Sequence, residues 1–406
     1  MESQKRNNKE LFKEALFVDR EAIYALLLCN NGLLSPIEHL MSEKEMQKVD
    51  SSGLYNNQNF PLSFVLAPSG KRNEQILLKC KKNTKLQLIC ENEICGYLIV
   101  DSIFKIDKKE RVFKIMGGDT SSTKANDIYN RLGDYAVCGK YKLNENIENK
   151  FFKYCATPQK IAALREKTNA KHISAMVLDA SPITRIHERI FRLILDESDV
   201  LVLLLLRHKN EVFLEFEMRK KCLELVIENF FPPNRIVIFA LDAIYLFAGS
   251  HGIILDSILA KNLGCDRIVI GENYPNLTLY YDNQKTISIF DTLKELEFNI
   301  KFISELVYCS KCNTIVSPRT CPHGDHHHIH YNSTFLQEIL KAGMIPPTIL
   351  VRKEISAKIL SHLFPKRFTP LLKQFSAMFS SSGMLEEQNE EDFYLKLAEL
   401  YKTSLN

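Results

Sequence analysis

The sequence predicts an α/β protein in which a small β-rich domain is followed by a domain built on a parallel sheet. Two observations lead to this prediction. Between residues 60 and 100, short apolar runs are separated by polar or turn residues, which is the spacing of short strands in a small sheet. From about Thr157, apolar runs alternate with helical stretches of about 10–15 residues, which is typical of βαβ units.

The N-terminal elements follow in order. Glu21–Leu28 is apolar on one helical stripe and stops at a polar Asn-Asn-Gly sequence, so we expect a helix there. A polar loop, Gly117–Thr123, precedes a last expected strand around Asp134–Val137. The other expected strands are Ser63–Leu66, Gln75–Leu78, Leu86–Cys90 and Tyr97–Val100.

The second region reads as alternating helices and strands. Ligands of parallel sheets bind at the carboxyl ends of the strands, so chemistry is expected in the loops after Leu178 and Ile270. Beyond Leu360 the chain looks helical, and an acidic linker at 380–391 is typical of a solvated surface or a contact in a homo-oligomer. The expected elements are Pro158–Lys167 (helix), Ile173–Leu178 (strand), a helix to about Leu195, Val200–Leu206 (strand), about Phe213–Asn229 (helix), Ile236–Phe239 (strand), about Ile253–Asn262 (helix) and Arg267–Ile270 (strand).

Composition narrows the class of protein. A chain of 406 residues with 45% hydrophobic and 25% charged residues is ordinary for a soluble globular protein of two or three domains. The net charge of +4 does not indicate a nucleic-acid partner. The most apolar run, Val200–Leu206, is too short to cross a membrane, which takes about 20 residues. The N-terminus lacks the apolar stretch of a secretory signal, and the 11 cysteines therefore fit a reduced, cytoplasmic setting.

The loop after the first strand of the second region carries a candidate anion site. It reads Asp-Ala-Ser-Pro-Ile-Thr-Arg-Ile-His-Glu over 179–188. Thr184 and His187 can present two donors to one anion at a helix start, whose free amides also attract negative charge. Alternatively, Thr184 is an ordinary N-cap and His187 lies on the helix surface. Taken by itself, the loop fits the cap better.

A second candidate site is a metal centre. Cys309, Cys312 and Cys321 provide three thiols in a spacing that suits tetrahedral Zn²⁺. The fourth ligand is His323, His326 or His327, and spacing does not decide between them. Free cysteines in a polar loop are the alternative, and metal is favoured. Four protein ligands would make the zinc structural and would fix the helix start that follows it.

These segments, taken together, resemble the ATP sulfurylase (sulfate adenylyltransferase) family of the nucleotidyltransferase superfamily. Residues 181–188 are similar to the second half of that family's Gln-x-Arg-Asn-Pro-x-His-x-x-His-Glu loop, and residues 332–340 stand where it has Ser-Gly-Thr-x-x-Arg-Glu-x-Leu. The other similar segments are Phe247–Gly249, Lys261–Gly271, the Cys-x-x-Cys segment from Tyr308, and, nearer the N-terminus, Asn31–Pro36, Phe60–Leu62 and Gly133–Gly139.

The resemblance implies four parts of the chain. A PUA-like β-rich domain would occupy residues 1–155 and a Rossmann-like parallel-sheet nucleotidyltransferase domain residues 156–305. A zinc segment with a phosphate-facing helix would follow over 306–360, and a helical C-terminal extension over 361–406. The implied reaction transfers AMP from ATP to an oxyanion and releases pyrophosphate. ATP with Mg²⁺ and a small anionic acceptor would be the partners.

The resemblance also assigns roles to residues. Thr184, Arg185 and His187 would be catalytic, the last two by neutralising charge on the α-phosphate as the leaving group departs. Such transfers depend mainly on positioning and electrostatics and need no side-chain nucleophile. Ser333 and Thr334 either hold phosphates at a helix start or act as a simple N-cap. The residues implied in nucleotide binding are Ser181, Pro182, Gly271, Ser333 and Thr334.

The chain departs from the family where sulfate would be held. Leu178 and Ala180 replace the family's Gln and Arg, Glu272-Asn273-Tyr274 replaces Arg-Asp-His, and Gln337 replaces an Arg. Doubly charged anions in dry sites are normally held by such donors. Two outcomes stay open. The enzyme adenylylates sulfate held by different groups, or another acceptor; alternatively, it has lost catalysis and serves as a nucleotide-binding or interaction protein. Retained transfer is favoured because the losses cluster at one end of the site.

Overall fold

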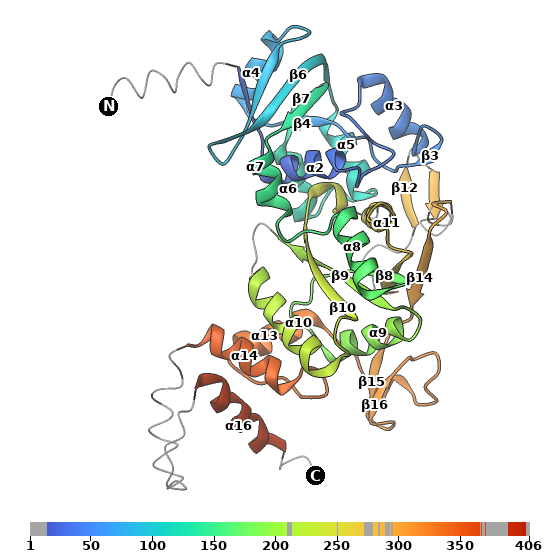
Figure 1. The fold of residues 1–406 in the computed structure, drawn as a ribbon, viewed down its shortest axis with the longest axis vertical. Coiled ribbons are helices and arrows are strands. Elements are labelled where there is room, and N and C mark those ends of the chain that lie inside the picture. Colours follow the sequence, from blue (N-terminus) through green and yellow to red (C-terminus); the bar gives the residue numbers. More distant parts are fainter. Residues whose placement is uncertain are drawn as a thin grey trace. The chain divides into compact units, whose positions relative to one another are not determined.

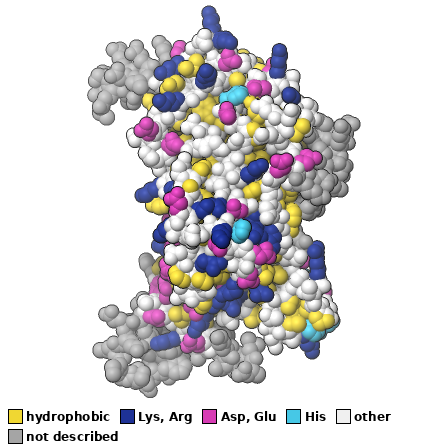
Figure 2. Space-filling model, turned by 45° about the vertical axis from the view of Figure 1, so that its right-hand side comes forward, with side chains coloured by type: hydrophobic (Ala, Val, Ile, Leu, Met, Phe, Trp, Pro, Cys, Tyr) yellow, Lys and Arg dark blue, Asp and Glu magenta, His cyan; other side chains and the backbone are white. Residues whose placement is uncertain are grey.

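The computed structural model describes residues 14–402 except 209–212, 250, 272–278, 283–284, 289–292, 294, 366, 368–369 and 371–388. The chain divides into two compact units (Figure 1). The first comprises Met1–Val177 with Phe239–Phe302, and the second comprises Leu178–Ile238 with Ile303–Asn406. Figure 2 shows Lys and Arg interspersed with Asp and Glu over the visible face, in agreement with the small net charge of +4.

A five-stranded sheet, ordered β1-β5-β6-β7-β4, forms the centre of the N-terminal region and confirms its β-rich character. β1 runs parallel to β5, and the other neighbours are antiparallel. A Cβ at Gly139 would lie 2.0 Å from the Ile99 carbonyl oxygen, so only glycine allows this approach of β7 to β6. The strands are β1 (Ala15–Phe17), β4 (Leu66–Pro68), β5 (Lys85–Cys90), β6 (Glu93–Lys105) and β7 (Leu132–Leu143).

Helices surround this sheet, and the small hairpin of β2 (Leu54–Tyr55) and β3 (Gln58–Asn59) accompanies them (Figure 1). The expected helix at Glu21–Leu28 is confirmed as α2, whose N-cap Asp19 accepts from the Ala22 amide at 2.8 Å. The helices are α2 (Arg20–Asn30), α3 (Glu43–Ser52), α4 (Lys71–Lys79), α5 (Lys108–Met116), α6 (Thr123–Arg131) and α7 (Glu145–Phe152).

Two expected strands of this region are corrected. Gln75–Leu78 is part of helix α4, in which Asn73 and Leu77 are buried at helical spacing. A short apolar run does not distinguish strand from helix, and here the helical period prevails. The expected strand Ser63–Leu66 overlaps β4 only at Leu66, because the Ser63 amide donates to Asp50 (3.2 Å) and the Phe64 carbonyl accepts from Met41 (2.8 Å).

The second sheet confirms the expected βαβ pattern, with strand order β10-β9-β8-β11-β14. β11 pairs with β8 in parallel, with Arg267 opposite Ser174. The border of the two units falls inside β8 and β10. The strands are β8 (Ile173–Leu178), β9 (Val200–Arg207), β10 (Ile236–Asp242), β11 (Arg267–Gly271) and β14 (Asn299–Ile303). The helices are α8 (Pro158–Thr168), α9 (Arg185–Leu195), α10 (Phe216–Phe230) and α11 (Gly252–Asn262).

The C-terminal part of the second unit combines a small sheet with helices, of which three lie among the described residues. The sheet has the order β16-β15-β17, with β15 at Val307–Cys309, β16 at Thr314–Val316 and β17 at His328–Ile329. The helices are α13 (Ser333–Lys341), α14 (Lys353–Leu363) and α16 (Glu390–Lys402).

The end of the chain is helical where the structure describes it. α16 packs on α14 and buries Tyr394 and Ala398, with Lys353–Glu399 (2.8 Å) as an ion pair between the helices. Glu390, expected in the acidic linker, begins α16, and residues 380–388 lie outside the described residues. Among the helices that the structure describes, none is long and apolar enough to cross a membrane.

Candidate functional site

The loop between β8 and α9 places Thr184 and His187 against each other in the second unit. Thr184 is buried and is the N-cap of α9. Its amide donates to Nδ1 of His187 at 3.0 Å, and its Oγ1 lies 2.9 Å from the same nitrogen. His187 therefore caps the amide of Thr184 from one turn into the helix. The structure thus brings the two predicted residues together at a helix N-terminus.

This hydrogen bond fixes the tautomer of His187. A backbone amide can only donate, so Nδ1 carries the lone pair and the ring proton lies on Nε2. Burial lowers the pKa of His187 to about 4, although Asp179 and Glu188 pull it upward. The ring is neutral at pH 7 and offers Nε2–H as an uncharged donor. Of the two residues expected to neutralise phosphate charge, only Arg185 carries a positive charge.

A buried carboxylate organises three arginines around the start of α9. Glu188, 4% exposed, accepts from Nε and Nη2 of Arg352, both at 2.7 Å. Arg185 (3.3 Å) and Arg192 (3.7 Å) approach the same carboxylate. One negative charge facing three guanidinium groups leaves two positive charges in excess, which favours anions nearby. Nothing in the sequence pointed to Arg352, because it lies 164 residues from its partner.

A buried arginine holds the ends of two strands in this unit. Arg219 on α10 is 1% exposed, and its Nη1 donates to the carbonyl oxygens of Asp179 and Leu206, both at 2.8 Å. Nη1 of Arg219 also contacts the Asp179 carboxylate at 2.9 Å. Nε2 of His208 contacts the same carboxylate at 3.2 Å. Arg219 and His208 hold the pKa of Asp179 below its usual range despite partial burial. Sequence reasoning missed Arg219, whose role depends on partners in two other segments.

Helix α13 meets the same loop through a side chain that departs from the family. Nε2 of Gln337 donates to the Ser181 carbonyl at 2.8 Å, so the helix and the loop are joined. Asn332, not Ser333 or Thr334, is the N-cap, and it accepts from the Phe335 amide at 3.0 Å. The simple N-cap interpretation of Ser333 and Thr334 is therefore wrong; they are the first two helix residues, and both are exposed.

The remaining predicted residues occupy different environments. Pro182 is buried and Ser181 is half-buried in the loop. Leu178 and Ala180 are 6% and 3% exposed, so apolar burial replaces the expected donors. Gly271 ends β11 in the first unit. Glu272, Asn273 and Tyr274 lie outside the described residues.

The metal-ligand candidates converge at the turn after β15. Donor atoms of Cys309, Cys312, Cys321 and His323 all lie within 4.8 Å of one another. Nδ1 of His323 is 3.4 Å from Sγ of Cys309, 3.3 Å from Sγ of Cys312 and 3.6 Å from Sγ of Cys321. Sγ of Cys312 is 3.8 Å from Sγ of Cys321. A tetrahedral zinc ion with ordinary bond lengths requires about 3.8 Å between sulfurs and about 3.6 Å from sulfur to nitrogen. The donor set fits such an ion.

Of the histidines considered for the fourth ligand, His323 lies in this group with the three cysteines, whereas His326 and His327 do not. The ring of His326 instead contacts His327, with centroids 4.0 Å apart. The Ser310 amide donates to the His327 carbonyl at 2.9 Å, which closes the loop around the cluster.

Hydrogen bonds of His330 and Tyr331 position the chain between the Cys-His cluster and α13. His330 lies between the carboxylates of Glu305 and Asp325, each at 3.1 Å, and these bonds raise its pKa. The hydroxyl of Tyr331 donates to the Ile349 carbonyl at 2.7 Å. These contacts hold the segment that leads into Ser333.

Both regions of the chain are similar to known proteins. The family model of ATP-sulfurylase matches residues 152–362, and that of the PUA-like domain matches residues 1–146. A sulfate adenylyltransferase of Carboxydothermus hydrogenoformans is 27% identical over 84% of this chain and 90% of its own. One from Chloroflexus aurantiacus is 26% identical over 84% of this chain and 89% of its own.

A solved structure described as a hexameric APS kinase from Thiobacillus denitrificans shares the fold, with a TM-score of 0.62 at 16% identity. The match covers 90% of this chain and 65% of that one. The N-terminal sheet is thus a PUA-like domain, and the parallel sheet lies in the region matched by the sulfurylase model. The chain belongs to the ATP-sulfurylase family, as a divergent member.

Proposed function

We propose that this protein transfers the AMP moiety of ATP to an oxyanion, with release of pyrophosphate. Sulfate adenylyltransferases at 23–27% identity over most of the chain support nucleotidyl transfer of this kind. The observation that carries the proposal is the Thr184–His187 pair at the N-terminus of α9, with Arg185 beside it. A helix start with two fixed polar groups and an arginine suits a phosphate chain.

In this proposal the side chains act by position and charge. Nε2–H of His187 donates to an oxygen of the α-phosphate, where charge grows as pyrophosphate leaves. Because the ring is neutral, it stabilises this oxygen as a dipole, while Arg185 supplies the positive charge. The hydroxyls of Ser333 and Thr334, which no cap interaction occupies, hold the terminal phosphates together with the first amides of α13. Ser181 and Pro182, in the same loop as Thr184, complete the nucleotide site, and Mg²⁺ accompanies ATP.

The expected acceptor end of the site departs from the family, and three of its residues favour a second candidate function. Leu178 and Ala180 are buried apolar residues, and Gln337 is engaged with the Ser181 carbonyl. Leu178 and Ala180 have no side-chain donor, and Gln337 lacks the positive charge of the arginine that the family has at this place. These observations favour a replacement acceptor, such as a phosphorylated metabolite, over sulfate. They also fit a degenerate relative that binds nucleotide or a protein partner without turnover.

We further propose that this Cys-His cluster binds a metal ion, that the ion is zinc and that its role is structural. Three thiolates and one imidazole complete a tetrahedral set, so no position is left for substrate or water. The ion would tie β15 to the loop that precedes α13, and thereby position the start of that helix.

Pyrophosphate release measured with a panel of oxyanions tests the proposal. The panel should include sulfate, phosphate and phosphorylated metabolites, and the protein should be metal-loaded. We expect Mg²⁺-dependent release with at least one acceptor, and its loss in His187→Ala. A thermal shift with ATP but no release with any acceptor would favour the binding protein. No response to ATP at all would refute both.

A further inference from the structure

Asp179 and His208 form a pair at the carboxyl edge of the parallel sheet. Asp179 directly follows the last residue of β8, and His208 directly follows the last residue of β9, its neighbour in the sheet. Nε2 of His208 lies 3.2 Å from Oδ1 of Asp179. Ligands of parallel sheets bind at this edge. The roles assigned above to the loop of Thr184 and His187 leave this pair without a function.

The carboxylate of the pair is fixed by a side chain from the interior. Nη1 of Arg219 donates both to the backbone carbonyl of Asp179 and to its Oδ1, at 2.8 and 2.9 Å. The same nitrogen donates to the carbonyl of Leu206, two residues before His208. A carboxylate held in this way can orient a histidine ring, as the aspartate of a catalytic triad does.

The carboxylate also determines where His208 carries its proton. Although partial burial works in the other direction, the hydrogen bond of His208 and the charge of Arg219 hold the pKa of Asp179 below its usual range. Asp179 is therefore an anion at pH 7 and can only accept a hydrogen bond. Neutral His208 then keeps its proton on Nε2 and its lone pair on Nδ1.

The second nitrogen of His208 is available to a ligand. Nδ1 has no hydrogen-bond partner among the residues that the structure describes, and the side chain is 41% exposed. A neutral histidine with an accessible lone pair and an orienting carboxylate is the usual form of a general base.

The pair lies near the residue assigned to the α-phosphate. Burial lowers the pKa of His187 to about 4, and the negative charge of Asp179 opposes this shift. Interactions between charges weaken with distance, so this effect indicates that His187 and Asp179 are close. Both histidines therefore lie within electrostatic reach of one carboxylate, with His187 beside the proposed phosphate position and His208 at the end of the next strand.

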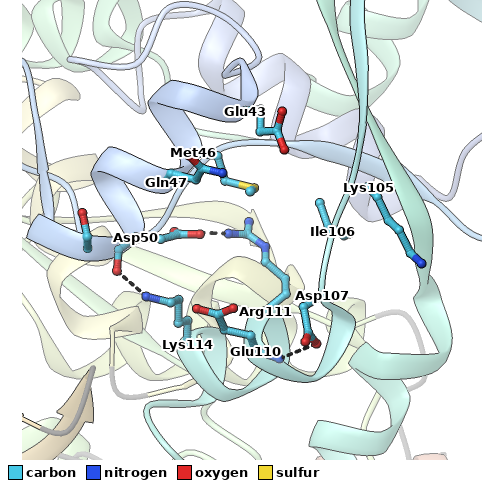
Figure 3. Close-up of a pocket in the computed structure, with 11 residues that line it drawn as sticks. Glu43, Met46, Gln47, Asp50, Lys105, Ile106, Asp107, Glu110, Arg111 and Lys114 are labelled. Carbon is cyan, nitrogen blue, oxygen red and sulfur yellow. Dashed lines mark hydrogen bonds and ion pairs between the residues drawn. The ribbon is translucent and has the colours of Figure 1, made fainter.

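The polar groups around a cavity of about 340 Å³ in the first unit are arranged differently (Figure 3). There, both Nη atoms of Arg111 donate to Ser63, and Lys114 donates to the carbonyl of Asp50. These bonds hold α5 to α3 and to the segment of Ser63, which is a structural role. His208, by contrast, spends only one of its two ring nitrogens on such a contact.

We propose that His208 is the general base of the adenylyl transfer and that the acceptor attacks through a hydroxyl group. This inference rests on the proposed transfer and narrows its replacement acceptor. Nδ1 of His208 takes the hydroxyl proton, the oxygen forms a bond to the α-phosphorus, and the bond from that phosphorus to pyrophosphate breaks. The attacking oxygen thus becomes anionic only within the site, and the ring afterwards returns its proton to solvent.

The same inference gives a reason for the departures from the family. Sulfate carries no proton at neutral pH and needs no base, whereas an alcohol must lose its proton when its oxygen attacks phosphorus. An uncharged hydroxyl compound also needs no arginine to hold it, which agrees with the buried apolar residues Leu178 and Ala180. A base where the family needs none, and apolar residues where it has donors, point to the same class of acceptor.

The first test compares acceptors in the metal-loaded, full-length protein with ATP and Mg²⁺. Methanol, glycerol and ribose are the hydroxyl probes, and sulfate and inorganic phosphate are the anionic probes. Pyrophosphate release and the mass of the adenylylated product are measured together, and we expect an AMP ester with at least one hydroxyl probe. Products with the anionic probes alone would overturn the hydroxyl acceptor and leave the proposed transfer standing. No product with any probe would overturn both.

The second test uses the hydroxyl probe that reacts and variants of the base. We expect His208→Gln to lower kcat at least about 100-fold, because general bases contribute about 10²–10⁴. KM for ATP should stay within about twofold, since His208 is not assigned to the nucleotide. Added imidazole should raise the rate of His208→Gly at least about tenfold, which no structural role of the side chain would produce.

His362→Gln is the matched control, because His362 is an exposed histidine on α14 of the same unit. We expect its kcat to equal that of the unmodified protein. An unchanged kcat in His208→Gln would refute the general base while adenylyl transfer stands. A lower kcat without rescue by imidazole, in a His208→Gly protein whose melting temperature is unchanged, would refute it as well.

Discussion

The ion pair between Glu188 and Arg352 offers a quantitative test of how the start of α9 is held. Glu188 is 4% exposed and Arg352 17%, and the two bonds that join them are both 2.7 Å long. Removing one partner of a buried pair costs about 3–5 kcal/mol because the other charge is left without compensation. Arg352 keeps some solvent access, and glutamine keeps one acceptor. We therefore expect Glu188→Gln to lower the free energy of unfolding by about 2–4 kcal/mol.

A double-mutant cycle separates this pair from its surroundings. Arg352→Met also loses the stacking of the guanidinium carbon, 3.3 Å above the Phe230 ring, so its single effect mixes two causes. The cycle of Glu188→Gln with Arg352→Met removes that ambiguity, and we expect a coupling energy of about 2 kcal/mol from urea denaturation. The control cycle uses Glu338 and Lys341 on α13, an exposed pair at 3.0 Å, for which we expect less than about 0.5 kcal/mol.

If the coupling energy of the Glu188 pair is no larger than that of the exposed pair, the carboxylate does not organise the arginines. Arg185 would then not be held beside the helix start by Glu188. A large coupling energy supports the view that Glu188 sets the position of the charge that the proposed reaction needs.

The pKa of His187 is about 4 in the folded protein and about 6.5 in the unfolded chain. The stability that neutral His187 contributes is therefore present above pH 6.5 and is lost as the pH falls toward 4. His187→Gln should make the free energy of unfolding less dependent on pH in that window. His323→Ala should lower bound metal, measured by atomic emission, and the melting temperature, whereas His326→Ala should change neither; equal losses would contradict the ligand assignment. Gln337→Leu removes the bond to Ser181 and should raise KM for ATP roughly 2- to 12-fold, corresponding to about 0.5–1.5 kcal/mol.

The regular elements of the second region could be predicted from sequence because each apolar run is long and bounded by turn residues. Ile173–Leu178 and Arg267–Ile270 were placed at or within one residue of their observed bounds. Gln75–Leu78 was assigned as a strand because three apolar residues in a row carry no period. The deciding signal was the burial of Asn73 with Leu77, which only the structure shows.

Sequence likewise predicts only part of the candidate site. Thr184 and His187 were found because their contact is local, three residues apart at a helix start. Arg352 and Arg219 were missed because their partners are distant in sequence, and no single-chain pattern records such contacts. Spacing alone does not distinguish the candidate histidines for the fourth metal ligand, because it limits how far a side chain can reach but not its direction. Only the structure shows that His323 lies beside the three cysteines.

The central claim is that the helix start at Thr184 and His187 serves adenylyl transfer. The most direct measurement is exchange of labelled pyrophosphate into ATP, with and without an oxyanion acceptor, in the metal-loaded protein and in His187→Ala. Our account predicts exchange that requires both Mg²⁺ and an acceptor and that disappears in the variant. Saturating ATP binding without exchange for any acceptor, or exchange that is unchanged in the variant, would contradict it.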